Sequence, residues 1–362
     1  MESYRARALL EYLAASPKYA CYHVDPRFYD SISGNFIARL FLKVLRVTDR
    51  IHDLIKLCIS DIVFILPMSR LAGIEAKLAK LFNKKIIGEF YISKYDTWVN
   101  DRKAVGLASR YANRLLKIDQ SFIDMCDVVI FLNASERAYY LKVTSREEAI
   151  TKSRIIPLAT GQKKMAAQRF ANNKRDQVVL CWWGTFIPLH GLEKIIECAV
   201  YLKSANINFQ LYLFGTSEEK SKPYRDQISK LGLSDYVIID NSKSFSDKTL
   251  ESFLVENCDI AFGNFGDSIK ARTVMVNKVV ESASMALPIV SQKTQALEEY
   301  FKNDESIFYT EPNAEKIAEK VIEMIQDKQK MLSVSKREFK LYEERFSRGA
   351  FIQDAIKVLD QV

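Results

Sequence analysis

The sequence is poor in the residues that build metal sites, disulfide frameworks and flexible linkers. Its 362 residues include only three histidines, and its six cysteines are scattered without a CxxC pair. These counts argue against a structural or catalytic zinc site, and we expect the cysteines to be reduced, as in a cytosolic protein. With only 12 glycines and eight prolines, the chain has no room for long disordered linkers.

Long apolar segments are missing as well. No uninterrupted hydrophobic run approaches the roughly 20 residues that cross a bilayer, and the charged N-terminus does not resemble a signal peptide. Hydrophobic residues make up 48% and charged residues 27% of the chain, as in soluble globular proteins, and the length suits two domains. We therefore expect a cytoplasmic protein, with a peripheral position on the inner face of the cell membrane as the alternative.

The net charge of +8 favours an anionic partner. No DNA- or RNA-reading motif accompanies this charge, so we expect no nucleic-acid partner, which leaves a phosphorylated substrate or an anionic membrane surface. A basic amphipathic stretch could lie on such a membrane, although a helix packed on its own sheet is the interpretation that we favour. Its apolar stripe consists of Ile37, Leu40, Phe41, Val44, Leu45, Ile51, Leu54, Ile55 and Cys58.

Short β-branched and aromatic runs alternate with helical patterns along the chain, which predicts α/β domains with parallel sheets. The strand candidates are 19–24, 61–66, 85–90, 127–132, 154–157, 178–183, 209–214, 236–239, 259–262, 288–291 and 306–309. A polar break near 162–176 separates two doubly wound, Rossmann-like domains that we expect to face each other across a ligand-binding cleft. The predicted divisions are 1–162 and 163–336 for the two domains and 337–362 for a C-terminal helical segment.

The two ends of the chain have unusual features. Residues 5–15 read as a helix, where a doubly wound domain normally begins with a strand. A start codon placed too late and a real loss of the first strand would each explain this, and the sequence leaves both open. At the other end, 337–362 is helical and rich in aromatic residues, so we expect it to fold back onto the N-terminal domain.

The loop after the strand at 178–183 suits a phosphate group. Gly184 lets backbone approach a ligand closely, and a helix begins near Gly191. The free N–H groups and the positive dipole end of that helix favour a diphosphate. Glycine loops before helices are common in α/β proteins, so this feature needs support from elsewhere in the chain.

That support comes from the stretch 277–290, which reads as a short helix, a proline stop and a strand. Lys278 and Glu281 are three residues apart and share one helix face. They form either an ordinary surface ion pair or a site in which the ammonium meets a phosphate and the carboxylate meets ribose hydroxyls. A basic cluster of Lys270 and Arg272 follows the loop that ends at Gly266, and it is either a phosphate-binding loop or a solvated one.

Between Val178 and Ser291 the sequence resembles the group 1 glycosyltransferases, family 4, which are retaining enzymes of the GT-B fold. In that family a strand ends in Gly-Arg-Leu, and after three residues Lys-Gly opens a helix; the spacing from Gly184 to Gly191 matches this without a gap. Glu281 falls on the second Glu of the family's Glu–seven residues–Glu motif. Asn277-Lys278 followed by Glu281 is similar to the family variant Pro-Asn-Lys-x-x-Glu.

The sequence departs from the family at charged positions. Thr185 and His190 stand where the family has the arginine and the lysine that meet the diphosphate, and Thr273 replaces the first Glu of the pair. Positive charge is therefore weaker where the leaving group becomes negative, and Lys270, Arg272 and Lys278 are the candidate replacements. The resemblance thus implies a donor site made of Gly184, Thr185, His190, Gly266, Lys270, Arg272, Thr273, Lys278 and Glu281, with Lys278 acting in catalysis.

In the first half, a predicted strand at 85–90 runs into a polar, aromatic loop. Carboxylates at the carboxyl end of a strand are well placed to orient sugar hydroxyls, and Glu89 or Asp96 could act as a base toward the acceptor. Because Asp often caps a helix, a structural role explains Asp96 nearly as well.

The resemblance implies a sugar transfer with retention of configuration, from a nucleotide diphosphate sugar to a glycan or lipid-linked acceptor, in the synthesis of envelope polysaccharide or lipopolysaccharide. It implies no metal ion and no cofactor besides the donor co-substrate. Two alternatives remain. One is a catalytically impaired partner or membrane adaptor subunit, which the departures at Thr185 and Thr273 keep open. The other is a nucleotide-sugar 2-epimerase, which would have a richer set of carboxylates and histidines around the donor.

Overall fold

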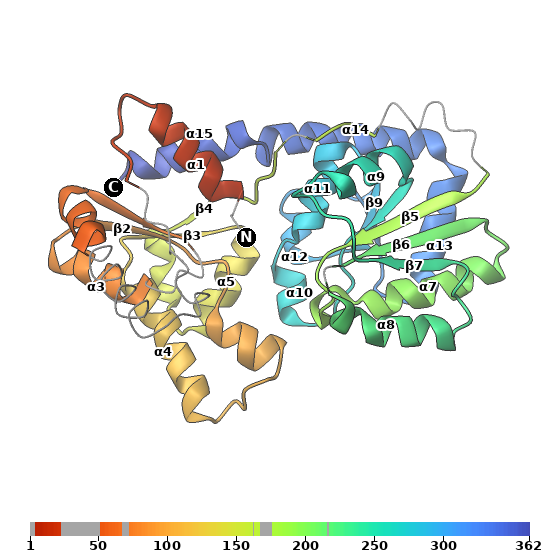
Figure 1. Ribbon diagram of the computed structural model, residues 1–362, viewed down its shortest axis with the longest axis horizontal. Coiled ribbons are helices and arrows are strands. Elements are labelled where there is room, and N and C mark those ends of the chain that lie inside the picture. Colours follow the sequence, from red (N-terminus) through yellow and green to blue (C-terminus); the bar gives the residue numbers. More distant parts are fainter. Residues whose placement is uncertain (1–3, 23–50, 67–71, 162, 167–175, 216) are drawn as a thin grey trace, which may run out of the picture.

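The computed structural model describes residues 4–22, 51–66, 72–161, 163–166, 176–215 and 217–362. It contains two domains, each with a parallel β-sheet and helices packed against it, which lie side by side with the C-terminal helices running along both (Figure 1). The prediction of two doubly wound α/β domains is confirmed.

The N-terminal sheet has the strand order β1-β2-β3-β4, and every neighbouring pair is parallel. Its strands are β1 (Ile62–Ile65), β2 (Lys85–Glu89), β3 (Val128–Phe131) and β4 (Ser153–Ile155). The helices of this domain are α1 (Tyr4–Ala15), α3 (Ala72–Leu81), α4 (Arg110–Met125) and α5 (Ala134–Val143), with a π-helical turn at Asp96–Asp101 and a 3-10 turn at Glu147–Lys152.

The opening helix predicted at 5–15 is α1, whereas the strand predicted at 19–24 is wrong as far as residue 22. Residues 19–22 belong to no strand, and Ala20, Cys21 and Tyr22 are exposed. A β-rich run needs neighbours that bury one face of it, and these residues have no such burial. Residues 23 and 24 lie outside the described part of the chain.

The C-terminal sheet has the strand order β10-β9-β8-β5-β6-β7, again parallel throughout. Its strands are β5 (Val178–Trp183), β6 (Phe209–Phe214), β7 (Val237–Asp240), β8 (Ile260–Phe262), β9 (Ile289–Gln292) and β10 (Phe308–Thr310). The chain builds outward from β5 to β7 and then continues with β8 on the other side of β5. Ligands of doubly wound sheets bind where the strand order reverses in this way, which singles out the carboxyl ends of β5 and β8.

Several helices of the second domain begin at a side chain that caps them. Ser217, Ser268 and Thr294 each accept a hydrogen bond from the first turn of the helix that follows, which satisfies N–H groups that the helix itself leaves unpaired. The helices are α7 (Leu192–Ser204), α8 (Glu218–Lys230), α9 (Thr249–Asn257), α10 (Ile269–Thr273), α11 (Asn277–Met285), α12 (Gln295–Glu298) and α13 (Ala314–Gln326), with a 3-10 turn at Pro188–His190.

Two C-terminal helices join the domains. Helix α14 (Lys328–Arg345) packs on α11 of the second domain, and α15 (Arg348–Leu359) returns to the first domain and packs on α1 (Figure 1). Phe351 and Ile352 of α15 share a buried cluster with Ala8 of α1 and Ile87 of β2. The expected crossing of the C-terminal helix back to the N-terminal domain is confirmed, and the division drawn at 336 falls inside α14.

Most of the basic amphipathic stretch, residues 37–50, lies outside the described residues. The rest of it, 51–59, is helical, and Ile51, Leu54 and Ile55 are 53%, 36% and 53% exposed. The favoured interpretation, a helix whose apolar stripe packs on its own sheet, is therefore wrong for these residues. Within the described ranges, no helix is both long enough and apolar enough to span a membrane.

Candidate active site

Two loops meet at the carboxyl ends of β5 and β8, and glycines let their backbones touch. Gly191 has a φ of +59°, and a Cβ there would lie 2.4 Å from the carbonyl oxygen of Phe265. A Cβ on Gly266 would lie 2.1 Å from the carbonyl oxygen of Leu189. Both distances are impossible for a real side chain, so glycine is required at each position. Helix α7 begins directly after Gly191 and points its first N–H groups to this edge of the sheet.

The side chain of Lys278 lies over this meeting point. Its Nζ is 3.1 Å from Nδ1 of His190 and 4.7 Å from the centre of the Trp182 ring. A Cβ built on Gly184 would lie 3.7 Å from Cε of Lys278. Three residues predicted for the donor site, Gly184, His190 and Lys278, are therefore brought together by the fold.

Burial sets the charge state of this cluster. Desolvation lowers the pKa of Lys278 to about 7, and Glu281 offsets this only in part. Burial, followed by the neighbouring Lys278, holds the pKa of His190 well below its ordinary value. The neutral imidazole can therefore accept a hydrogen bond from the Lys278 ammonium at Nδ1. A buried lysine that gains or loses a proton near neutral pH responds strongly to an anionic ligand.

Glu281 lies one turn further along α11 and is half-buried. Its Oε2 accepts a hydrogen bond of 2.6 Å from the indole N–H of Trp183, and burial raises the pKa of the carboxyl group. The Trp183 ring meets the Phe245 ring edge to face at 6.3 Å, and Nζ of Lys163 lies 4.3 Å from the centre of the Phe245 ring. A carboxylate beside aromatic rings suits a ribose and its base. Lys163 and Phe245 were not among the predicted site residues, because no local pattern in the sequence connects them to Glu281.

The other predicted donor residues lie less centrally. Thr185 is half-buried directly after Gly184, and Arg272 is exposed on α10. Thr273 is buried at the end of α10, where its hydroxyl donates to the carbonyl oxygen of Ile269 at 3.0 Å. The Thr273 carbonyl oxygen accepts from the side-chain amide of Asn133 in the other domain at 2.8 Å. The roles of Thr185, Arg272 and Thr273 as donor ligands stay predictions.

Lys270 reaches across to the N-terminal domain. Its Nζ is 3.1 Å from Oδ2 of Asp96 and 3.6 Å from Oδ2 of Asp101. Asp96 is fully buried and also accepts hydrogen bonds from Asn100, at 3.1 Å, and from the hydroxyl of Tyr139. The structure thus couples a predicted donor residue to a predicted acceptor base, and each partner neutralises the other in this arrangement.

Glu89 is also buried, and its Oε1 lies 2.5 Å from a guanidinium nitrogen of Arg5 on α1. The same guanidinium donates to the carbonyl oxygens of Ile156, at 2.9 Å, and Pro157. This ion pair ties α1 to the carboxyl ends of β2 and β4 and accounts for the burial of both charges. A catalytic role for Glu89 stays a prediction.

Glu136 is a perturbed carboxyl group that the sequence analysis missed. It is fully buried in the first turn of α5, accepts from the backbone N–H of Leu132 at 2.8 Å, and burial raises its pKa to about 8. The available signal was the spacing from Asn133 to Glu136, which is typical of a helix N-terminus.

Glu299 of the C-terminal domain closes the N-terminus of α5 in the N-terminal domain. Its carboxylate accepts from the backbone N–H groups of Ala134, at 2.6 Å, and Ser135, at 2.7 Å, and from the Ser135 hydroxyl at 2.6 Å. Asn133, at the N-cap position of α5, makes no cap hydrogen bond and turns to Thr273 instead. A carboxylate suits the positive end of a helix, so one domain supplies the cap for a helix of the other.

Glu299→Ala is expected to let the two domains separate more readily, because loss of a helix cap costs about 1 kcal/mol. Small-angle scattering should show a larger radius of gyration for this variant than for the parent protein. Glu298→Ala is the matched control, since Glu298 pairs with nearby Lys293 of the same domain, at 2.8 Å. If the radius is unchanged in both variants, this cap does not hold the domains together.

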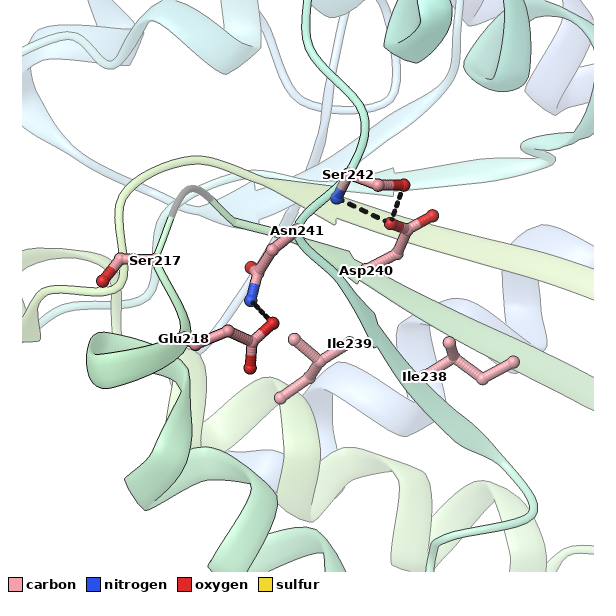
Figure 2. Close-up of a pocket in the computed structure, with 7 residues that line it drawn as sticks. All are labelled: Ser217, Glu218, Ile238, Ile239, Asp240, Asn241 and Ser242. Carbon is pink, nitrogen blue, oxygen red and sulfur yellow. Dashed lines mark hydrogen bonds between the residues drawn. The ribbon is translucent and has the colours of Figure 1, made fainter.

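A shallow pocket of about 660 Å³ lies at the carboxyl ends of β6 and β7 (Figure 2). Figure 2 shows the Asn241 amide pointing to Glu218 at the start of α8, with a hydrogen bond of 2.6 Å. None of the predicted donor residues lines this pocket. Among the residues that the structure describes, no three His, Cys, Asp or Glu side chains form a group that could hold a metal ion.

Residues 164–340, just under half of the chain, match the model of the family described as glycosyl transferases group 1. This part of the chain, which includes most of the C-terminal domain, is similar to the group 1 glycosyltransferases. The resemblance drawn from Gly184, Gly191 and Glu281 is thereby confirmed. No curated protein matches the chain in sequence.

Solved structures resemble the whole chain in fold. Anabaena HepE in complex with UDP and glucose is 13% identical, over 92% of this chain and 85% of HepE, with a TM-score of 0.66. Sucrose-phosphate synthase from Thermosynechococcus elongatus is 14% identical, over 96% and 82% of the two chains, with a TM-score of 0.66. The apo form of WaaB, a lipopolysaccharide outer core galactosyltransferase, is 12% identical, over 89% and 82%, with a TM-score of 0.56. These likenesses confirm the GT-B fold.

Proposed function

We propose that this group 1 glycosyltransferase moves a sugar from a nucleotide diphosphate sugar to a glycan or lipid-linked acceptor, with retention of configuration and without a metal ion. The observation that carries the proposal is the position of Lys278. Its ammonium lies beside Gly184 and His190 at the point where the strand order reverses, and this is where a diphosphate would bind.

The proposed mechanism follows from charge. When the bond between the anomeric carbon and the diphosphate oxygen breaks, negative charge collects on the leaving group and positive charge on the sugar. The Lys278 ammonium and the first N–H groups of α7 would stabilise the leaving group. The acceptor oxygen would bond to the anomeric carbon on the face that the diphosphate leaves, which retains the configuration. Asp96 would take the proton of that acceptor hydroxyl after the hydroxyl replaces one of its present partners, Lys270, Asn100 or Tyr139.

Two of the similar structures guide the choice of substrates. HepE has been solved with UDP-glucose, and WaaB is named for a reaction on lipopolysaccharide. We therefore propose a uridine nucleotide as the first donor to test, and a role in cell-envelope polysaccharide or lipopolysaccharide synthesis at the cytoplasmic face of the membrane.

A thermal-shift panel of UDP, GDP, dTDP, ADP and CMP tests the donor site. A nucleotide present at 100 times its dissociation constant is expected to add about 2.7 kcal/mol of stability, because it binds only the folded protein. Glu281→Gln is expected to reduce this shift while leaving the ligand-free midpoint close to that of the parent protein. A variant that merely unfolds would identify Glu281 as a structural carboxylate.

If none of the nucleotides raises the thermal midpoint, the alternative function is favoured, which is a catalytically impaired partner subunit. Two observations keep this alternative open. Thr185 supplies no charge where the family has arginine, and the charge of Lys270 is neutralised by Asp96. Nucleotide binding that appears only after a partner chain is added would support it directly.

A further inference from the structure

The helix at 51–59 turns its apolar side to solvent. Ile51, Leu54, Ile55 and Ile59 are spaced as on one helix face, and even the most buried of them is 36% exposed. Leu57, on the other side, is buried in the same cluster as Ala76 and Ala79 of α3. A helix on the surface of a soluble domain normally turns its apolar stripe inward. The opposite orientation here calls for a partner that covers it.

The end of α3 also exposes large apolar side chains. Leu81 and Phe82 are 76% and 43% exposed, and Ala76 and Ala79 of α3 belong to the same buried cluster as Leu57. The backbone N–H of Lys85 donates to the carbonyl oxygen of Asp61 at 3.1 Å, which joins the segments that follow the two helices. Both helices lie at the end of the N-terminal domain that is remote from the donor domain (Figure 1). We call this apolar set the end surface: Ile51, Leu54, Ile55, Ile59, Leu81 and Phe82.

Lysines are frequent in the segment that carries Leu81 and Phe82. Residues 76–85 contain Lys77, Lys80, Lys84 and Lys85 and no acidic residue. Lys77, Lys80 and Lys85 are exposed, and Lys80 is 3.1 Å from Asp127. Apolar side chains next to basic ones match the interface of an anionic bilayer, where the former enter the acyl region and the ammonium groups stay among the headgroups. A purely apolar protein partner would not require the lysines.

We propose that the end surface docks this protein on a membrane that carries anionic lipids. The inference rests on the proposed function in one respect, because a lipid-linked acceptor gives an enzyme a reason to stay at a membrane. Docking through the end of the N-terminal domain leaves the donor domain free to exchange nucleotide with the solution. Each lysine near an anionic surface strengthens binding about fivefold at moderate salt. The apolar residues contribute binding free energy that salt does not screen.

Co-sedimentation of the full chain with vesicles tests the proposal. The parent protein is expected to bind vesicles of equal parts phosphatidylglycerol and phosphatidylcholine, and to bind pure phosphatidylcholine at least tenfold more weakly. Leu81→Glu with Phe82→Glu is expected to lower binding by about tenfold or more. Lys77→Gln with Lys84→Gln and Lys85→Gln should lower it chiefly at low salt. Tyr201→Glu, at a 44% exposed aromatic residue on α7 of the donor domain, is the matched control and should bind as the parent does.

Vesicle binding that is absent in the parent, or equal in the parent and in both sets of variants, would overturn the inference. Light scattering distinguishes one further outcome: if the parent is a dimer that the Leu81 and Phe82 variant converts to a monomer, and vesicles are not bound, the end surface is an interface between two copies. The UDP thermal shift on the same variants separates the two proposals. A retained shift without vesicle binding refutes only the membrane inference, whereas vesicle binding without any nucleotide shift refutes only the proposed function.

Discussion

Lys278→Ala is expected to lower the rate of sugar transfer about 10²-fold, the size of effect seen when one preorganised transition-state partner is removed. The effect should be large because the neighbouring positions offer little replacement charge: Thr185 is neutral, burial keeps His190 neutral, and Lys270 is paired with Asp96. The measurement is the initial rate of transfer, or of donor hydrolysis while the acceptor is unknown.

Lys357→Ala is the matched control, since Lys357 is exposed on α15, which packs on the N-terminal domain, and pairs with Asp354 at 2.9 Å. Its rate should equal that of the parent. The thermal midpoint of Lys278→Met checks that the folded state survives, and it should not fall, because an apolar side chain replaces a buried amine whose charged form is disfavoured. A parent-like rate for Lys278→Ala would move the diphosphate site elsewhere.

Donor affinity is expected to fall about tenfold for each pH unit above 7, because a diphosphate selects the ammonium form of Lys278 and burial lowers the pKa of this group to about 7 in the free protein. Below pH 7 the ammonium is already present and affinity should level off. Above pH 7, binding has to take up a proton, and it does so until the pH reaches the higher pKa of the complex.

Calorimetric titration with UDP-glucose between pH 6 and 9, in roughly unit steps, measures this dependence. UDP-glucose is preferable to UDP because its diphosphate has no terminal phosphate that titrates near neutrality. Two buffers of different ionisation enthalpy should reveal the uptake of about one proton at pH 8. Lys278→Met should bind weakly with a flat profile, and a flat profile in the parent protein would contradict the assignment of Lys278 as the titrating group.

Local patterns in the sequence sufficed for most of the secondary structure around the site. The strand at 178–183 and the helix residues Leu192, Ile195, Ile196 and Ala199 are buried as their hydrophobic spacing predicts. The glycine at position 191 predicts where α7 begins, and the spacing from Lys278 to Glu281 predicts that both lie on one face of α11. Such features depend on residues within a few turns of each other, so a single sequence is enough to read them.

Tertiary structure alone decided which of these groups meet. Lys278 contacts His190, and Trp183 donates a hydrogen bond to Glu281, because α11 lies at the carboxyl ends of the central strands β5 and β8. Lys270 meets Asp96 only because the two domains face each other. The helix at 51–59 shows the same division: its apolar stripe is readable in the sequence, but the buried side of the helix is the one that carries Leu57, and the stripe is exposed. A pattern determines which residues share a face, whereas the direction of that face depends on contacts between segments distant in sequence.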